Sequence, residues 1–453
     1  MRLRPLGELL QDLPEERELI VAPSGKWTSS RLLEGLAERR ARAEGMRVAV
    51  QLADTAGIVR ALAALDGSAE AIGLFSFATE PEAVVRMARV GSFGGIVTDR
   101  ADTFAGVKDC PPVFGDVPPG RWAPSTAGDR GDTRWILTTS GTTGKPKMVS
   151  HSLKSLTLTT KTNVSRGASI TWGLLYDHAR FAGLQVVLQS IIAGSRLVAP
   201  RPDIPLSDKL ALFASEGCTH LSATPTLWRK IAMIPGSERL PLQQITLGGE
   251  IADDQILAAL TRLFPHARIS HVFASTEAGV GFSVIDRRAG FPMSFLDNPP
   301  AGIGLAVRDG QLYVRNENVF PAYLGTDTGF STSDGWIDTG DSVRIENDRV
   351  LFLGRANGVI NVGGDKVHPE EVERVLLEHP LVGAVRIYAK ANPITGALVA
   401  ADIVLRDPSR GTKEIREELR MFVLSKLERH KVPNFMLFVT DLQLSAAGKV
   451  ARP

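Results

Sequence analysis

The stretch Thr138-Thr139-Ser140-Gly141-Thr142-Thr143-Gly144-Lys145-Pro146-Lys147 follows a short apolar run, Trp135–Thr138, and is the most informative part of this sequence. Its glycines let backbone N–H groups approach an anion, its hydroxyl groups add donors, and Lys145 supplies a positive charge. The stretch is not a Walker A loop, because Pro146 stands where that motif has Ser or Thr. It therefore predicts a strand followed by a phosphate-binding loop, with an exposed polar hairpin turn as the alternative.

Around this loop the chain alternates helix-like stretches with short apolar runs. Leu32–Ala43 is followed by Met46–Leu52, and Ile58–Leu65 is followed by Ala71–Phe75. This alternation is typical of an α/β fold, and the apolar runs are short enough to be buried parallel strands. Further runs of this kind are Gly95–Val97, Trp135–Thr138, Ser195–Ala199 and His220–Ser222.

After about residue 300 the sequence pattern changes from alternating helices and strands to strands joined by turns. Gln311–Arg315 and Val350–Leu353 predict strands joined by Gly/Asp turns. The last hundred residues predict a separate unit with elements at Pro369–Leu377 (helix), Ala384–Ala389, Leu398–Leu405 (strands), Lys413–Leu427 (helix) and Met436–Val439 (strand). We expect a large α/β N-terminal domain (1–354) of mixed and parallel sheets flanked by helices, a hinge (355–358) and a small mobile C-terminal α+β domain (359–453).

The composition is that of a globular protein without a dominant surface charge. Hydrophobic residues make up 43% and charged residues 23% of the 453 residues, and the net charge is +2. Nothing in this balance favours a nucleic acid or a membrane surface as the partner. Cys110 and Cys218 form no disulfide or zinc pattern, which fits a cytoplasmic location. The start of the chain lacks the apolar core of a signal peptide, and no apolar run is long enough to predict a membrane span.

The loop, with Met148–His151 directly after it, closely resembles the signature of the adenylate-forming superfamily, which comprises acyl- and aryl-CoA ligases, peptide-synthetase adenylation domains and luciferases. The resemblance implies that the loop binds the phosphates of ATP. Further motifs follow in the order that the family has them. Gly248-Gly249-Glu250 resembles the segment that packs against adenine, although a plain turn after a strand at Gln244–Leu247 is the alternative for this segment alone.

The segment Val272–Glu277 resembles the family's aromatic-Gly-x-Thr-Glu motif. By this resemblance Phe273 stacks on adenine, Thr276 contacts phosphate and Glu277 ligates Mg²⁺, a hard ion that prefers oxygen ligands. The resemblance also implies that Asp341, in Asp334–Asp341, accepts hydrogen bonds from the ribose hydroxyls, although in isolation it is typical of a surface turn.

The remaining motifs lie towards the C-terminus. By resemblance Arg355 reaches ribose or phosphate, and the segment Val362–Glu373, with Gly363, Gly364 and Lys366, leaves room for the arm of a thiol substrate. Lys449 matches the family's terminal Gly-Lys, and the resemblance implies that it bridges the substrate carboxylate and the α-phosphate. Lys449, Thr276 and Glu277 are thus the expected catalytic residues.

Several positions depart from the family pattern. Asn357 stands where the hinge usually has aspartate, although Asn followed by Gly358 permits unusual backbone angles. In the expected substrate pocket, Ala274 replaces a glycine. The segment Tyr176–Gly183 resembles the family's His-x-x-Gly helix start with Arg180 at the histidine position. Arg180 meets a second acidic group of the substrate, bonds locally or points to solvent. The pocket residues expected from these motifs are His178, Arg180, Phe181, Gly183 and Ala274.

The resemblance implies ATP-dependent activation of a small carboxylic acid, with ATP, Mg²⁺ and coenzyme A as cofactors and release of pyrophosphate. Transfer of the acyl group to coenzyme A is the leading hypothesis. Loading of the phosphopantetheine of an acyl-carrier protein is an alternative, although we expect no fused carrier domain after Lys449. A non-catalytic nucleotide-binding protein is an alternative of another class. Plain or aromatic acids are favoured over amino acids, and a homodimer is one of the open oligomeric states.

Overall fold

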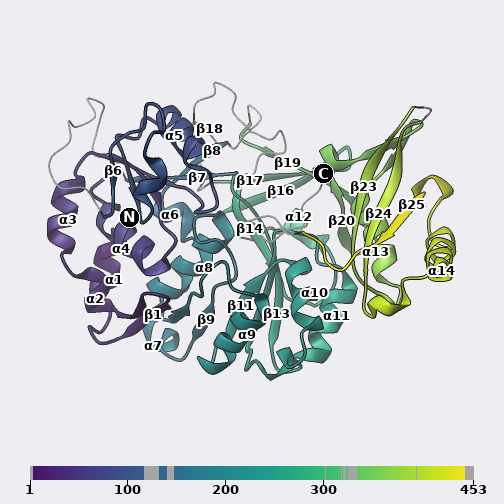
Figure 1. The fold of residues 1–453 in the computed structure, drawn as a ribbon, viewed down its shortest axis with the longest axis horizontal. Helices are drawn as coiled ribbons and strands as arrows, with labels where there is room; N and C mark the ends of the chain where they lie inside the picture. Colours follow the sequence, from purple (N-terminus) through teal and green to yellow (C-terminus); the bar gives the residue numbers. More distant parts are fainter. Residues whose placement is uncertain are drawn as a thin grey trace.

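The computed structural model describes residues 4–116, 132–139, 147–300, 302–317, 319, 323–324, 334–393 and 395–443 (Figure 1). These residues form three sheets in a large N-terminal part and a fourth in a small C-terminal domain. Figure 1 shows the small domain, with β23, β24, β25 and α14, at one end of the molecule. The fold class expected from the sequence is confirmed. In the part of the chain that is described, no helix is long and apolar enough to cross a membrane.

The first sheet contains the strand that leads into the loop. Its order is β18-β8-β7-β4-β3-β5-β6, and the strands from β7 to β6 run parallel while β8 and β18 are antiparallel additions. Main-chain pairing of Thr138 with Met148 makes β7 and β8 a hairpin. The strands are β3 (Arg47–Gln51), β4 (Ala71–Leu74), β5 (Gly95–Thr98), β6 (Val113–Phe114), β7 (Arg134–Thr138), β8 (Met148–His151) and β18 (Tyr323–Leu324).

The helices of this region begin and end at residues with a local reason. Asp54 caps the first turn that follows it, because its carboxylate accepts the backbone N–H of Gly57 (3.0 Å). The single helix predicted over Leu32–Ala43 is wrong, since Gly35 adopts a left-handed φ of 68° and separates two short helices. The helices are α1 (Leu6–Gln11), α2 (Ser29–Leu33), α3 (Leu36–Ala43), α4 (Thr55–Leu65), α5 (Pro81–Val90), α6 (Leu153–Leu156) and α7 (Val164–Gly167).

The second sheet has the order β14-β13-β12-β11-β9-β10-β1-β2. From β13 to β1 all neighbouring strands are parallel, so their carboxyl ends meet at one edge. The strands are β1 (Glu18–Ala22), β2 (Gly25–Thr28), β9 (Thr171–Gly173), β10 (Arg196–Val198), β11 (His220–Ala223), β12 (Gln244–Gly248), β13 (Arg268–Ser275) and β14 (Gly279–Val284). The helices are α8 (Phe181–Ile192), α9 (Leu206–Ser215), α10 (Pro225–Met233) and α11 (Asp254–Leu263).

One hydrophobic core joins the two sheets. Leu62 of α4 and Leu188 of α8 are fully buried in it, together with Val50 from the first sheet and Leu197 from the second. Both helices are apolar around most of their circumference, which is typical of helices covered on two sides. The layer formed by α4 and α8 between the two sheets fixes the position of the end of β7 relative to the end of β13.

The third sheet has the order β15-β20-β19-β17-β16 and is antiparallel at each pairing. Its strands are β15 (Phe291–Pro292), β16 (Ile303–Arg308), β17 (Gln311–Asn316), β19 (Ile337–Glu346) and β20 (Arg349–Arg355), and the short helix α12 (Ser294–Asp297) lies beside it. The strands predicted at Gln311–Arg315 and Val350–Leu353 are confirmed. A 3₁₀ turn, Ala356–Gly358, then connects β20 to the small domain.

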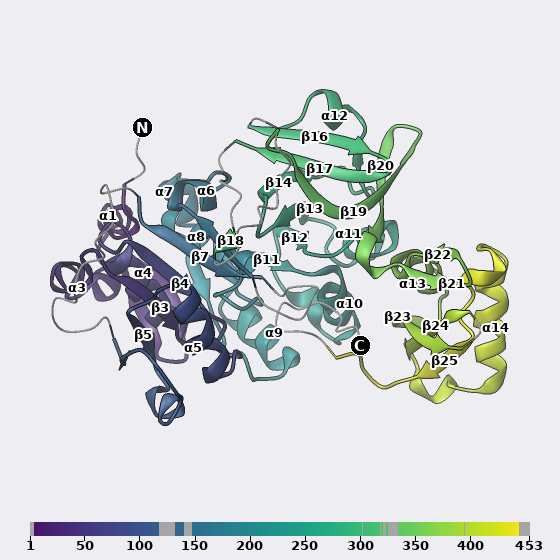
Figure 2. The ribbon, with the colours of Figure 1, turned by 90° about the horizontal axis from the view of Figure 1, so that it is seen from above.

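The small domain places two helices on one face of its sheet. Val375 of α13 and Leu419 of α14 are buried against Ile387 and Ile403 of the sheet. The elements are β21 (Ile360–Val362), β22 (Asp365–Val367), α13 (Pro369–Leu377), β23 (Val382–Asn392), β24 (Gly396–Leu405), α14 (Lys413–Leu424) and β25 (Phe435–Phe438). All five predicted elements are confirmed, although α14 ends before the predicted Leu427. Figure 2 shows α10 and α11 on the side of the large domain that faces this unit.

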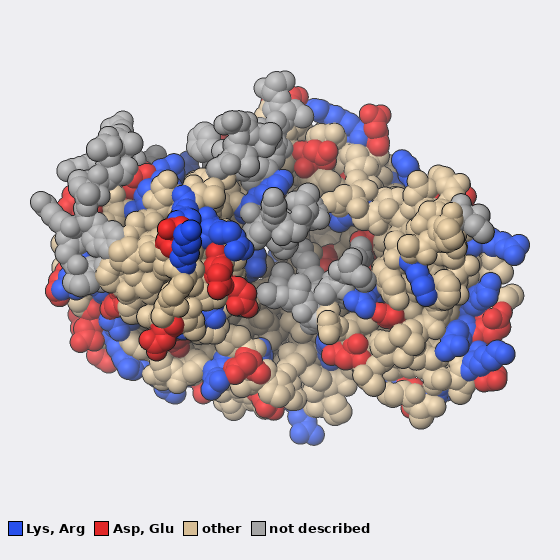
Figure 3. Space-filling model, turned by 45° about the horizontal axis from the view of Figure 1, so that its top comes forward, with Lys and Arg blue, Asp and Glu red and all other residues tan. Residues whose placement is uncertain are grey.

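The molecular surface carries both signs of charge. Figure 3 shows Lys and Arg side chains interspersed with Asp and Glu over the face that is drawn. This distribution agrees with the net charge of +2. Attraction of an anionic ligand therefore depends on groups placed locally in a site.

Candidate active site

Several of the segments singled out in the sequence gather at the carboxyl edge of the second sheet and at the adjacent end of β7. Gly248 ends β12, Ser275 ends β13, and the segment 174–180 follows β9 into α8. In open α/β sheets ligands bind at such an edge, where loops from neighbouring strands converge.

The loop begins and ends within the β7–β8 hairpin. The backbone N–H of Thr139 donates to the carbonyl of Lys147 (2.8 Å), which closes the base of the loop. Thr138 is buried at the end of β7. The predicted phosphate-binding residues between these positions, Ser140, Gly141, Thr142, Thr143, Gly144 and Lys145, lie outside the described residues.

His151 connects this hairpin to the segment after β13. Its Nε2 lies 2.7 Å from the carbonyl oxygen of Thr276, and its Nδ1 lies 3.3 Å from Oγ of Ser155. The ring is also 5.7 Å from that of Phe181, centroid to centroid. Burial lowers the pKa of His151 to about 4, so the imidazole is neutral at physiological pH. The contact brings Thr276 and Glu277 to the side of the loop hairpin.

The turn before α8 requires glycine at residue 183. A Cβ there would overlap the backbone carbonyl of Asp177, so the first turn of α8 lies directly against the 177–178 backbone. The N–H of Ala179 donates to the carboxylate of Asp177 (2.9 Å), which tightens the same turn. Gly183 therefore permits the close approach that positions Arg180 and Phe181 at the start of α8.

Both ring nitrogens of His178, which was predicted to line the substrate pocket, are hydrogen-bonded within the protein. Its Nε2 bonds to the carbonyl of Leu52 (2.9 Å) and its Nδ1 to the hydroxyl of Thr55 (2.9 Å). The side chain is 6% exposed. With both ring nitrogens bound to the protein, His178 fastens the turn to the start of α4 and leaves no nitrogen for a ligand.

Arg180 lies beside the end of β7. Its Nη1 donates to the carbonyl of Thr138 (3.3 Å), while its Nε is buried without a hydrogen-bond partner. Local bonding, one of the alternatives for this residue, is thus present. Ala274 lies at the β13–β14 bulge, half-buried against the core of the large domain.

The segment after β12 is held from two sides. The carboxylate of Glu250 accepts the backbone N–H of Thr226 (2.9 Å), and Gly249 adopts a φ of 82° that favours glycine. The buried hydroxyl of Tyr176 donates to the carbonyl of Gly248 (3.4 Å), and burial raises the pKa of Tyr176. This segment is a constrained turn at the sheet edge.

Phe273 belongs to an aromatic cluster that joins the second and third sheets. Its ring is nearly parallel to those of Phe282 (5.2 Å between centroids) and Phe352 (5.6 Å), and both of these contact Phe291. Such pairs add to the stabilisation from burial alone. The cluster fixes the position of β13 relative to β20.

Asp341 and Arg355 are brought together by strand register. They are cross-strand partners in β19 and β20, and Nη1 of Arg355 lies 3.0 Å from Oδ1 of Asp341. The same Nη1 donates to the carbonyl of Thr339 (2.5 Å). A guanidinium that bonds a carboxylate and a carbonyl at once holds both in a defined orientation.

The domain junction depends on a residue that the sequence did not single out. Positive φ in this junction occurs at Gly354 (140°), and neither Asn357 nor Gly358 has a positive φ in this structure. A Cβ at Gly354 would collide with the carboxylate of Glu370 in α13. Asn357 itself is exposed in the 3₁₀ turn. The glycine directly before Arg355 was the sequence signal from which this junction could have been predicted.

The turn between β21 and β22 and the start of β22 carry three predicted site residues of the small domain. Gly363 and Gly364 have φ values of 64° and 104°, and the N–H of Gly364 donates to the side chain of Asn361 (2.9 Å). Lys366 is exposed on β22. Lys449 lies outside the described residues.

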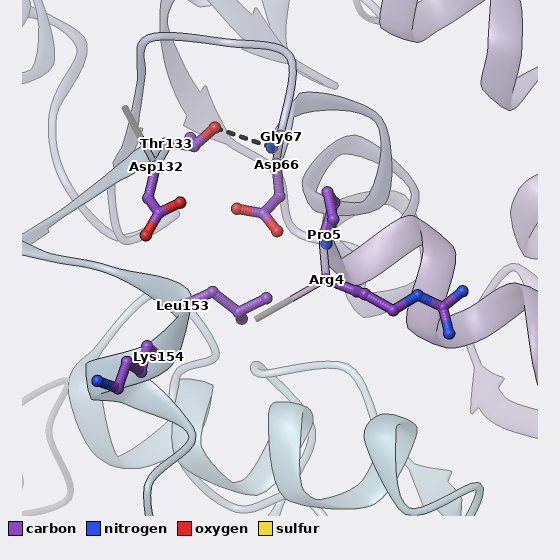
Figure 4. Close-up of a pocket in the computed structure, with 8 residues that line it drawn as sticks. All are labelled: Arg4, Pro5, Asp66, Gly67, Asp132, Thr133, Leu153 and Lys154. Atoms are coloured by element: carbon purple, nitrogen blue, oxygen red, sulfur yellow. Dashed lines mark hydrogen bonds between the residues drawn. The ribbon is translucent and has the colours of Figure 1, made fainter. Parts of the chain in front are cut away.

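A cavity of about 320 Å³ lies at the amino end of β7, opposite the loop (Figure 4). Figure 4 shows the carboxylates of Asp66 and Asp132 pointing into it and Arg4 pointing away. Asp66 accepts the N–H of Leu6 and the indole N–H of Trp135, both at 2.8 Å. Its carboxylate therefore anchors α1 to β7, and the cavity does not belong to the candidate site.

No group of three or more His, Cys, Asp or Glu side chains suited to a metal ion occurs in the described part of the chain. In nucleotide sites Mg²⁺ is commonly held by one or two protein carboxylates, with substrate phosphates and water as its other ligands. This fits Glu277 as a single carboxylate ligand.

Two residues that position the candidate site, His151 and Tyr176, were not among the site residues predicted from the sequence. His151 directly follows the loop signature, which was a usable signal for a connection to the site. Tyr176 carried no signal of its own, because its bond to Gly248 depends on the packing of two separate strand ends.

Comparison with known proteins agrees with this arrangement. The AMP-binding enzyme family matches residues 46–324, and the AMP-binding enzyme C-terminal domain matches residues 371–449. The chain is 24% identical over 277 residues to a 4-coumarate–CoA ligase of Glycine max (55% of this chain, 93% of the relative). It is 27% identical over 336 residues to a 2-succinylbenzoate–CoA ligase of Bacillus cytotoxicus (69% of this chain, 67% of the relative).

A solved structure shows the same fold over nearly the whole chain. The o-succinylbenzoate CoA synthetase of Bacillus subtilis, in complex with its acyl-adenylate intermediate, superimposes with a TM-score of 0.74 at 20% identity. The superposition covers 99% of this chain and 97% of the other. Together with the family matches, it shows that this chain belongs to the AMP-binding enzymes, the adenylate-forming superfamily.

Proposed function

We propose that this protein activates a carboxylic acid with ATP and transfers the resulting acyl group to the thiol of coenzyme A. The observation that carries the proposal is the bond between His151 and Thr276, because it joins the loop that resembles a phosphate site to the segment that resembles a magnesium site. Relatives that are CoA ligases for 4-coumarate and 2-succinylbenzoate support the same reaction class.

In the first step an oxygen of the carboxylate attacks the α-phosphorus of ATP, and the bond from that phosphorus to the bridging oxygen breaks. Pyrophosphate leaves with the electron pair, and an acyl-adenylate remains. Two anions must approach each other, so the protein contributes mainly orientation and positive charge. Residues 138–145 and Lys147 hold the β- and γ-phosphates, and Lys449 bridges the carboxylate and the α-phosphate.

The nucleotide is held by groups whose geometry is already constrained. Asp341, oriented by Arg355, accepts hydrogen bonds from the two ribose hydroxyls through its two carboxylate oxygens. Phe273 and the turn Gly248–Glu250 enclose the adenine. Thr276 contacts phosphate and Glu277 offers a carboxylate oxygen to Mg²⁺, which when bound neutralises phosphate charge.

In the second step the thiol of coenzyme A gives up its proton to water, and its sulfur attacks the acyl carbon while AMP leaves with the electron pair. We propose that residues 359–453 rotate about the hinge 355–358, with Asn357 at its centre, between the two steps. Rotation withdraws Lys449 and brings Gly363, Gly364 and Lys366 towards the thiol. The acid itself lies against Arg180, Phe181 and Ala274.

A pyrophosphate-release assay tests the function. Aliphatic, aromatic and amino acids are each supplied with ATP and Mg²⁺, with and without coenzyme A, beginning with 4-coumarate and 2-succinylbenzoate as aromatic probes. We expect an aromatic or plain acid to stimulate release and to yield an acyl-CoA. Lys449→Ala removes the stimulation, whereas Lys413→Ala, an exposed lysine at the start of α14, retains it.

Three results would change the proposal. Stimulation by no acid would favour a non-catalytic nucleotide-binding protein. Acyl transfer to a pantetheinylated carrier protein but not to coenzyme A would assign the alternative acceptor. Full adenylation by Lys449→Ala would refute the role given to that lysine.

A further inference from the structure

Lys230, near the end of α10 in the large domain, binds the segment of the small domain that leads to Lys449. Its Nζ lies 2.6 Å from Oδ1 of Asp441 and donates to the carbonyl of Leu442 at 3.0 Å. The Lys230 side chain is only 18% exposed. A cation with a carboxylate and a carbonyl as acceptors makes a more specific contact than a simple surface ion pair.

The bound segment is itself rigidly attached to the small domain. The side chain of Leu442 is 2% exposed and clusters with Ala384 and Val404 on the sheet face opposite the helices. The N–H of Leu442 donates to the carboxylate of Asp441 (2.8 Å), which orients that carboxylate. Lys230 therefore contacts a segment that is packed against the sheet of the small domain.

The interface beside this contact is incompletely packed. A cavity of about 430 Å³ lies between α10 and α11 on one side and the α13–β23 connection on the other. Its lining includes Arg229, Met233, His379 and Arg406. The Lys230 contact is therefore one of those that fix the domain orientation here, beside the approach of Met233 in α10 to Gly383 in β23, where an added Cβ would lie 3.0 Å from the sulfur.

The other end of the small domain is open in this orientation. A Cβ at Gly364 would meet nothing within 4 Å. The large domain thus holds the end that continues to Lys449, while the β21–β22 turn stays open. Lys449 follows Leu442 by seven residues, a tether that spans at most about 25 Å when extended.

We propose that Lys230 is a positioning residue that holds the small domain in the orientation for acid activation. The proposal rests on the proposed function, since it assigns this orientation to the first of the two steps. Loss of the contact shifts the population of orientations away from the one that presents Lys449. The first step then slows, while the second step, which needs the other orientation, does not.

Separate assays of the two steps test this role. ATP–pyrophosphate exchange with the acid that the release assay selects measures activation, and transfer from the preformed acyl-adenylate to coenzyme A measures the second step. We expect Lys230→Met to slow exchange about three- to tenfold, with transfer unchanged or faster. Asp441→Asn weakens exchange in the same direction, and Lys230→Arg retains most of it.

A matched control is available within the small domain. Lys426 pairs with Glu378 without crossing to the large domain. Lys426→Met removes an ion pair of similar kind, and the ratio of the two rates stays that of the unsubstituted enzyme. Equal slowing of both steps by Lys230→Met, or no slowing of exchange, would overturn the proposal.

A distance measurement separates failure of this proposal from failure of the proposed function. Nitroxide labels are placed on Glu238→Cys in the large domain and on Glu417→Cys in α14, in a Cys110→Ser background. Double electron–electron resonance then measures the distance between the labels, which reports the domain orientation without any substrate. We expect one dominant distance, which Lys230→Met broadens or replaces. An identical distance distribution in the variant refutes the positioning role of Lys230, even if the protein activates no acid. A changed distribution supports that role, again whether or not an acid is activated.

Discussion

The imidazole of His151 lies 2.7 Å from the carbonyl oxygen of Thr276 and joins two segments that are 125 residues apart. A carbonyl only accepts, so Nε2 carries the proton of the neutral ring. Because the ring is 4% exposed, this bond forms in a poorly solvated environment where an unpaired group is costly. The loop hairpin and the Thr276–Glu277 segment are therefore positioned by one shared side chain.

Replacement of His151 by Phe keeps the apolar volume and removes this bond. We expect the variant to lose about 1–3 kcal/mol of unfolding free energy, because the carbonyl of Thr276 is left without its donor. Pyrophosphate release falls as well, since Glu277 adjoins the released carbonyl. Urea denaturation and the release assay measure the two effects. His266→Phe, at an exposed position, leaves both unchanged; equal effects in the two variants would show that His151 has no special role.

Buried histidines predict a loss of stability in acid. Burial lowers the pKa values of His151 and His220 to about 4 from an ordinary 6.5, so the unfolded chain binds more protons than the folded one between these values. Stability is complete above about pH 6.5 and falls towards pH 4, by up to about 3 kcal/mol for His151 alone. Denaturation midpoints across this range measure the slope. A slope as steep in His151→Phe as in the unsubstituted protein would contradict the assignment.

Gly183→Ala tests the close approach of α8 to the 177–178 backbone. The added Cβ would overlap the carbonyl of Asp177, and backbone atoms cannot move aside as a side chain can. We expect a loss of at least about 1–3 kcal/mol in unfolding free energy and a lower melting temperature. Gly115→Ala is the matched control, since its Cβ would enter open space. Equal melting temperatures for both variants would disprove the constraint.

Asp341→Asn tests the ribose site. The amide retains the shape of the carboxylate but loses its charge and one pair of acceptors, so the ribose hydroxyls are bound less well. We expect the KM for ATP to rise about tenfold with the KM for the acid little changed. Asp348→Asn alters an exposed carboxylate at the turn after the same strand and should leave both constants unchanged. An unaltered KM for ATP would remove Asp341 from the site.

Arg180→Met tests which anion this side chain serves. Its Nε has no hydrogen-bond partner, and among the described residues its guanidinium makes one hydrogen bond, the 3.3 Å contact to Thr138, so it retains capacity for a ligand. We expect the KM for the acid to rise at least about threefold, more for a diacid than for a monoacid. A rise confined to the KM for ATP would instead place Arg180 with the phosphate loop.

Local patterns in the sequence predicted most of the elements. Turn residues, apolar runs and Pro369 at a helix start depend on neighbours a few positions away, which is why five of the helices and strands of the small domain were predicted. The helix over Leu32–Ala43 failed because Gly35 breaks it with a left-handed angle. The helix expected to reach Leu427 ended early at Leu424.

The sequence by itself determined the family, through the loop at 138–147 and the ordered motifs that follow it. Only the tertiary structure assigned His178 to the support of α4, brought His151 to Thr276, and placed Lys230 against Asp441. The reason is physical. A motif specifies local backbone and chemistry, whereas contacts across more than a hundred residues depend on how helices and sheets pack around a common core, and no short pattern encodes that.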